Sequence, residues 1–192
     1  MDINHALRFQ LDWHWANQLR LRLDGLTDDE YLWEPVPGCW SLRPRGQSTA
    51  PIQGGSGDMV IEFAHPEPSP PPVTTIAWRL GHILVGVLGA RNAAHFGAEP
   101  VDYFGYDYPT TALEALTRLD EAVETWSAGV AALGEDGLRS PCGPAEGKWH
   151  EHPMLDLVLH INREMLHHGA EIALLRDLYT WGGPVHIRRQ RP

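Results

Sequence analysis

The chain has 192 residues, of which 43% are hydrophobic, and this is enough to bury the core of one compact domain. Asp and Glu outnumber Lys and Arg by 25 to 15, and the formal net charge of −10 repels a phosphate backbone, which argues against nucleic-acid binding. No apolar run reaches the roughly 20 residues of a membrane helix, and the start of the chain lacks the basic-then-apolar order of a signal peptide. We therefore expect a cytoplasmic protein with no membrane partner. The two cysteines, Cys39 and Cys142, lie far apart in Pro-rich stretches and imply neither a disulfide framework nor a redox CxxC motif.

Amphipathic helices are predicted for most of the chain. Apolar residues recur at three- and four-residue spacing in four segments, which predicts helices over 4–23, 73–96, 110–133 and 153–179. A short helical turn is expected to follow Thr27, because Thr27 and Glu30 have the spacing of a capping box. Gly97 and Gly134 are the expected ends of the second and third helices. Four long helices with no internal repeat and no strong set of strands indicate an all-α four-helix bundle.

The first and second predicted helices are joined by a long stretch, 33–73, that is rich in proline and glycine. Connections between bundle helices usually have 2–8 residues. We expect this one to be either a functional segment, such as a lid over a site, or a disordered loop. Met59–Phe63 is its candidate strand. The chain is then one domain over 1–182, followed by a short basic tail over 183–192.

The fourth predicted helix carries His160, Glu164 and His168, each four residues from the next. This spacing stacks the three side chains on one face of a helix, and Leu157 and Ile161 on the same side indicate that part of that face points inward. Glu164 and His168 together could bind one metal ion. The alternative is an ordinary surface pair, worth a few tenths of a kcal/mol.

His82 lies in the middle of the second predicted helix, among apolar residues. A buried histidine needs a polar partner, and a metal ion is one kind of partner. If the second and fourth helices are antiparallel neighbours, His82 lies opposite Glu164 and His168. Such a His-Glu-His set leaves positions open for water or substrate, as a catalytic metal site requires. The alternative is that His82 is a core residue with an ordinary hydrogen bond.

Three segments resemble one family. They are PGCWSLRPR at 37–45, PPVTTIAWRLGH at 71–82 and LHINREMLHHGAEIALLRDLY at 159–179. They resemble the DinB-like, or DNA-damage-inducible, four-helix bundles. The match is specific at the second and fourth helices and vague at the third. The family's name refers to DNA damage and implies no DNA binding.

The resemblance implies a divalent metal held by one histidine of the second helix and by two ligands four residues apart on the fourth. These positions fall on His82, Glu164 and His168. Most members have histidine where this chain has Glu164. The same glutamate occurs in the branch of mycothiol-dependent maleylpyruvate isomerase and the mycothiol S-transferases, and this chain resembles that branch at the metal site. This chain shows no counterpart of that isomerase's second domain, so its particular substrate does not carry over.

The resemblance implies a metal-dependent thiol transferase or isomerase that joins a low-molecular-weight thiol, such as mycothiol as co-substrate, to a small electrophile. His160 would be the catalytic residue, as a proton carrier or as a support for the ligands. Zinc is the first expectation for the metal, with nickel, iron or manganese as alternatives. Two other functions stay open, a metal-dependent hydrolase on the same site and a non-catalytic bundle that binds a metal or small ligand. A small bundle with eight tryptophans is also compatible with a homodimer.

Overall fold

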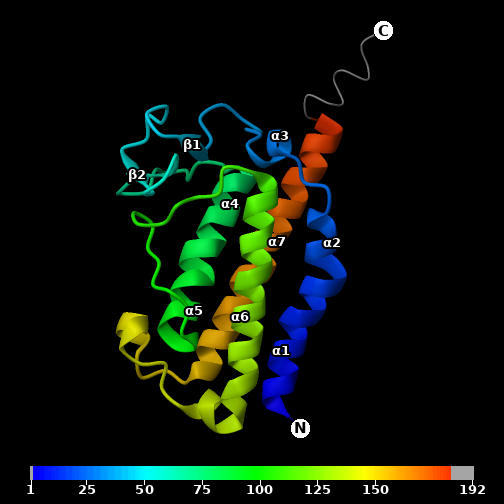
Figure 1. Cartoon of the computed structure of the whole chain (residues 1–192), viewed down its shortest axis with the longest axis vertical. Helices are drawn as coiled ribbons and strands as arrows, with labels where there is room; N and C mark the ends of the chain where they lie inside the picture. The colour runs from blue at the N-terminus through cyan, green and yellow to red at the C-terminus, as the bar shows by residue number, and fades with distance from the viewer. Residues whose placement is uncertain (1, 183–192) are drawn as a thin grey trace.

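Helices make up most of the described chain, residues 2–182, in this computed structural model. The long helical segments lie side by side along the long axis of the molecule (Figure 1). In chain order they are α1 (Ile3–His14), the π-helical turn η1 (Trp15–Leu19) and α2 (Arg20–Leu23); α4 (Ile76–His82), the π-helical turn η2 (Ile83–Val87) and α5 (Gly89–Phe96); α6 (Ala112–Arg139); and α7 (Met154–Gly182). The shorter helices α3 (Asp28–Tyr31) and η3 (Pro144–Trp149, a 3-10 helix) lie in the connections. The prediction of a mainly helical chain is confirmed.

The faces that the long helices turn toward one another are apolar. Leu119, Val123 and Trp126 on α6 and Ile161 and Met165 on α7 are each at most 4% exposed. Burying one such side chain contributes about 1.5–3 kcal/mol. This core forms a rigid frame for any polar side chain placed on the same faces. Within residues 2–182, no helix combines the length and the apolar character needed to cross a membrane.

Capping residues set the helix starts where the sequence indicates them. Thr27, Thr75 and Thr111 each accept a hydrogen bond from the backbone N–H three residues later, at the starts of α3, α4 and α6. Gly97 ends α5 in the left-handed conformation, with φ of +75°. Gly134 also has a positive φ, +60°, but it only kinks α6, which continues beyond the predicted end. The predicted basic tail lies outside the described residues.

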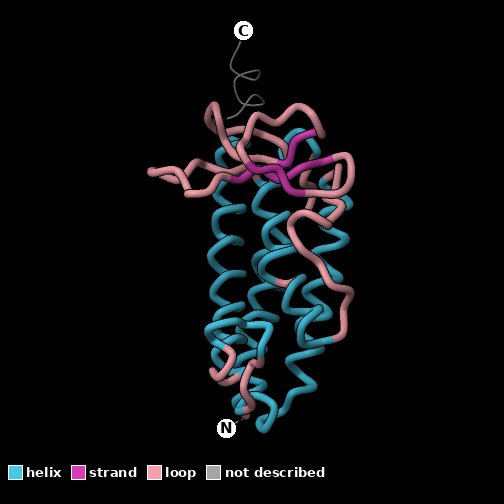
Figure 2. The backbone as a smooth tube through the Cα atoms, turned by 90° about the vertical axis from the view of Figure 1, so that its left-hand side faces the viewer, coloured by secondary structure: helices cyan, strands magenta, loops and turns pink. Residues whose placement is uncertain are grey.

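The stretch 33–73 contains a small sheet, which corrects the expectation of an all-α chain. Its strands are β1 (Leu42–Pro44), β2 (Ile52–Gly54) and β3 (Met59–Phe63), in the spatial order β1-β3-β2 and all antiparallel. Figure 2 shows the sheet across one end of the helices. Strands of three to five residues are too short to give a clear alternating pattern, and their pairing is non-local. Only the candidate strand β3 was visible in the sequence.

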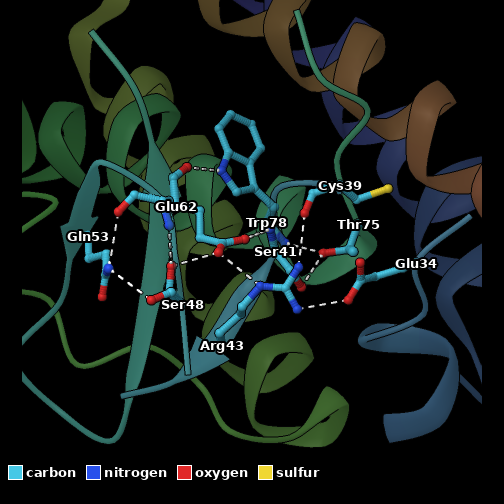
Figure 3. A network of polar contacts seen from close by, with 10 residues as sticks. Glu34, Cys39, Ser41, Arg43, Ser48, Gln53, Glu62, Thr75 and Trp78 are labelled. Carbon is cyan, nitrogen blue, oxygen red and sulfur yellow. Dashed lines mark hydrogen bonds and ion pairs between the residues drawn. The ribbon is translucent and has the colours of Figure 1, made fainter. Parts of the chain in front are cut away.

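A buried carboxylate holds the sheet together (Figure 3). Glu62 is 4% exposed and accepts hydrogen bonds from Ser41 N at 2.9 Å, Ser48 Oγ at 2.7 Å and Arg43 Nε at 2.9 Å. Several donors compensate the cost of burying its charge. The backbone oxygen of Glu62 accepts from Trp78 Nε1 at 2.8 Å, which ties the sheet to the first turn of α4. The sheet therefore fixes the start of the helix that ends at His82.

Candidate metal centre

His82 is the last residue of α4, and the π-helical turn η2 begins directly after it. A π-helical turn changes the direction of the side chains that follow, and such turns are frequent at functional sites. The imidazole of His82 lies edge-on to that of His168, with ring centroids 4.8 Å apart at an interplanar angle of 86°. Side chains of the second and fourth long helical segments therefore meet here.

Glu164 and His168 lie one turn apart on α7, and the structure brings both to His82. One ligand atom from each of the three residues lies within 4.8 Å of the other two. His168 Nε2 is 3.5 Å from Glu164 Oε2, close to the ~3.3 Å that separates two atoms bound to one tetrahedral zinc ion. His168 is buried and the other two are half-buried. The donor set and its spacing fit a divalent metal ion.

Both histidines use Nδ1 for a hydrogen bond on the outer side of this cluster. His82 Nδ1 lies 2.7 Å from the Tyr103 hydroxyl, and His168 Nδ1 lies 2.8 Å from Glu171 Oε2. Arg79 Nη2 in turn is 3.0 Å from Glu171 Oε1. A hydrogen bond at Nδ1 orients the ring and leaves Nε2 as the ligand atom. Partners of this kind are typical of histidines that bind metal.

Tyr103 reaches His82 because Gly86, one turn further along, has no side chain. A Cβ built at Gly86 would lie 2.0 Å from the Tyr103 hydroxyl oxygen. The ring of Trp78 stacks on His82, with centroids 5.6 Å apart at 18°, and Phe63 of β3 meets Tyr103 edge-on at 5.0 Å. These aromatic rings shield one side of His82 from water.

Burial lowers the pKa of His82 to about 4, with smaller contributions from the charges of His168, Arg79 and Arg91. The His82 imidazole is therefore neutral at pH 7. Neutral imidazole is the form that binds a metal ion.

A sequence model of the DinB superfamily matches residues 10–172, a range that includes all three clustered residues. The chain belongs to the DinB superfamily. No curated protein and no solved structure matches the chain. The family assignment predicted from the three quoted segments is confirmed. DinB superfamily members include metal-dependent enzymes, in keeping with the donor set found here.

His160 lies at the edge of the cluster of His82, Glu164 and His168. Its Nδ1 is 3.4 Å from Glu164 Oε1 and 2.6 Å from Arg163 Nη2, and the side chain is partly exposed. Since the arginine can only donate, Nδ1 accepts and the other ring nitrogen carries the proton. Burial lowers the pKa of His160, and Glu164 partly opposes this effect. His160 is thus placed to contact Glu164 without joining the three clustered ligand atoms.

A second group of metal-binding residue types overlaps the first. His167, His168 and Glu171 bring their ligand atoms within 4.8 Å of one another. Glu171 already forms an ion pair with the Arg79 guanidinium, and Nδ1 of His168 is hydrogen-bonded to Glu171. This arrangement suits a support for His168 better than a second metal ion.

The two cysteine thiols are buried and belong to neither cluster. Burial raises the pKa of both Cys39 and Cys142, so they are neutral thiols at pH 7. Each donates to a backbone carbonyl, Cys39 to Val36 and Cys142 to His152. They have the character of structural residues.

Tyr103, Glu171 and Arg79 were not predicted from the sequence. Glu171 lies three residues after His168, and this spacing on a helix was the signal available for it. Tyr103 lies in the irregular stretch 97–111, where no periodicity places a side chain. Its part in the site is visible only in three dimensions.

Proposed function

We propose that the chain is a metal-dependent enzyme in which His82, Glu164 and His168 hold a divalent ion and a low-molecular-weight thiol is joined to a small electrophile. The supporting observation is the convergence of three ligand atoms within 4.8 Å while both histidines bind outer partners through Nδ1. The proposal takes the long helices as the four-helix bundle of the DinB type, in which sites lie between facing helices. Zinc is the proposed ion, because histidine and carboxylate ligands suit it, with nickel, iron and manganese as alternatives.

Three protein ligands leave a coordination position for an exogenous molecule. A bound divalent ion supplies Lewis acidity there, lowering the pKa of a thiol or a water molecule near neutral pH. Residues of the chain orient the ligands and limit the access of water. Tyr103 and Glu171 orient the two imidazoles, and Trp78 and Phe63 limit water on one side.

His160 is proposed as the residue that moves a proton. Its Nδ1 accepts from Arg163 Nη2 at 2.6 Å and lies 3.4 Å from Glu164 Oε1. Burial lowers the pKa of His160, which favours the neutral imidazole, and Nδ1 can take a proton from a thiol once the exposed Arg163 side chain turns away from it. The co-substrate thiol is proposed to be mycothiol or a similar small thiol, because the cysteines of the chain are buried and neutral.

Metal analysis of the purified protein tests the site. We expect about one divalent ion per chain and its loss in His82→Ala, whereas His5→Ala, an exposed histidine on α1, keeps it. Unchanged metal content in His82→Ala would contradict the assignment.

Turnover assays separate the functions that share this site. Consumption of a small electrophile only when mycothiol is added supports the thiol enzyme. Turnover without thiol identifies a hydrolase. A metal-free protein whose melting temperature does not respond to zinc, nickel or iron identifies a non-catalytic bundle.

A further inference from the structure

Gly86, in the π-helical turn η2, lies directly beside the hydrogen bond between His82 and Tyr103. The π-type backbone bond of this turn joins Leu88 N to Ile83 O at 2.9 Å. A Cβ built at Gly86 would lie 2.0 Å from the Tyr103 hydroxyl oxygen and 3.2 Å from His82 Nδ1. A small shift of the Gly86 backbone would therefore change the contact between these two side chains.

The carbonyl oxygen of Gly86 is held by a side chain. Arg91, five residues further along on α5, donates to this oxygen from Nη1 at 2.5 Å. Where a π-helical turn meets an α-helix, the regular ladder of backbone hydrogen bonds is interrupted, and carbonyl groups there take other donors. A hydrogen bond from a charged donor is stronger than one from a neutral donor. The Arg91 guanidinium thus fixes the Gly86 carbonyl within the turn.

Arg91 is itself held in place by the connection between α6 and α7. Its Nη2 lies 3.3 Å from Oε2 of Glu146 on η3, and Oε1 of Glu146 lies 2.9 Å from His95 Nε2. The side chains of Glu146 and His95 are only 8% and 7% exposed, so the buried carboxylate depends on these partners. Arg91 and Glu146 also line a cleft of about 470 Å³ beside His160. One arginine therefore joins the wall of this cleft to the π-helical turn.

The burial of Arg91 distinguishes it from an ordinary surface arginine, whose exposed ion pairs contribute little to stability. Its side chain is 27% exposed, and its Nε is buried with no hydrogen-bond partner among the described residues. A buried N–H without a partner is costly. The contacts of Nη1 and Nη2 compensate this cost only in the position that holds Gly86 O and Glu146 together.

We propose that Arg91 is a positioning residue of the metal centre and acts on the His82 ring through the carbonyl of Gly86. With this carbonyl held, Gly86 leaves the gap through which the Tyr103 hydroxyl reaches His82 Nδ1. That hydrogen bond directs Nε2 of the ring toward the other two ligands. The effect of Arg91 on metal affinity rests on the proposed function, whereas its effect on the His82 ring requires no ion.

Nitrogen NMR of the histidine rings tests the effect on His82 in the metal-free protein, with His82→Gln identifying the signal. We expect wild-type His82 to carry its proton on Nδ1 and Arg91→Met to show a mixture of both tautomers, because the bond to Tyr103 is no longer fixed. Arg91→Lys offers Gly86 O another cationic donor and should restore most of the wild-type signal. The same His82 signal in the wild type and Arg91→Met would overturn the proposal.

Cobalt(II) binding tests the effect on the metal centre, because the visible spectrum of the ion reports the arrangement of its ligands. We expect Arg91→Met to bind cobalt about tenfold more weakly than the wild type, with an altered spectrum. Arg20→Met is the control, since Arg20 is 30% exposed and forms ion pairs with Asp24 and Asp120. It should bind cobalt like the wild type. Equal cobalt affinity in the two variants would count against the proposal.

A double variant covers a possible effect on folding. Arg91→Met leaves the buried Glu146 with His95 as its remaining partner, which can weaken the fold. Arg91→Met combined with Glu146→Gln removes the buried charge as well, and circular dichroism checks both proteins. The double variant should show the mixed tautomers and the weaker cobalt binding. A wild-type His82 signal in it would overturn the proposal.

The two measurements separate this proposal from the proposed function. If the wild type binds no cobalt while Arg91→Met changes the His82 signal, the metal-dependent function fails and the action of Arg91 on His82 stands. If the wild type binds cobalt and Arg91→Met leaves both readouts unchanged, the positioning role is wrong and the metal centre stands.

Discussion

At the scale of single residues, the outer hydrogen bonds of the two histidines are the sharpest feature of the site. In the tautomer that leaves Nε2 free for a metal ion, His82 Nδ1–H donates to the Tyr103 hydroxyl and His168 Nδ1–H donates to Glu171. Neither partner belongs to the set of three ligand atoms. Their proposed effect is on the direction and tautomer of the rings, which should show in metal affinity.

Tyr103→Phe removes one hydroxyl and leaves the ring. We expect zinc affinity to fall by about 10- to 100-fold, because ring orientation and tautomer are no longer fixed. Competition with a chromophoric chelator measures this. Tyr106→Phe is the control, since Tyr106 lies in the same loop and packs on Tyr108 and Arg118. Equal affinity in the two variants would show that Tyr103 has no such role.

Gly86→Ala should have the same effect by a different route. Its Cβ would fall 2.0 Å from the Tyr103 hydroxyl and push it away from His82. Gly182→Ala is the control, since a Cβ there meets nothing within 4 Å. Zinc affinity is measured in both variants. If Gly86→Ala binds zinc as tightly as the wild type, the Cβ does not displace the Tyr103 hydroxyl from His82.

The depressed pKa of His82 predicts a pH dependence of stability. With a pKa of about 4 in the folded metal-free protein and about 6.5 when unfolded, His82 takes up a proton on unfolding between these values. Stability therefore falls as the pH drops from 7 toward 4, by about 3 kcal/mol from this residue alone. Urea unfolding across this range should show a smaller loss in His82→Gln. Identical pH dependence in the two proteins would contradict the assigned pKa.

At the scale of elements, most helix boundaries could be predicted from the local sequence, whereas the three-stranded sheet could not. Threonine caps and Gly97 act within a few residues of their own position, so the sequence carries their effect. The strands β1 and β2 depend on β3 and on the buried Glu62, which is reached from residues up to 21 positions away. Non-local pairing of this kind leaves no periodic pattern.

The Glu62 network predicts how strongly the sheet is held. Arg43→Met leaves a buried carboxylate without its cation and should lower stability by about 3 kcal/mol. The exposed pair of Arg139 with Glu135 should matter little, so Arg139→Met should change stability by less than about 0.5 kcal/mol. Thermal unfolding compares the two variants. A similar melting temperature for both would mean that the network does not anchor the sheet.

At the scale of the whole molecule, the site depends on which helices are neighbours. The four-residue spacing of Glu164 and His168 on one helix predicted that they stack on one face. The hypothesis that the second and fourth helices are antiparallel neighbours predicted that His82 lies opposite them. The structure brings these three together. Tyr103 and the cleft beside His160 depend on loops 97–111 and 140–153, whose paths the sequence does not specify.

We propose that one divalent ion is bound between α4 and α7. The most direct measurement is a crystal structure of the zinc-soaked protein with data collected on both sides of the zinc absorption edge. We expect one anomalous peak within about 2.2 Å of ligand atoms from His82, Glu164 and His168. A peak held by other residues, or no peak at these three, would contradict it.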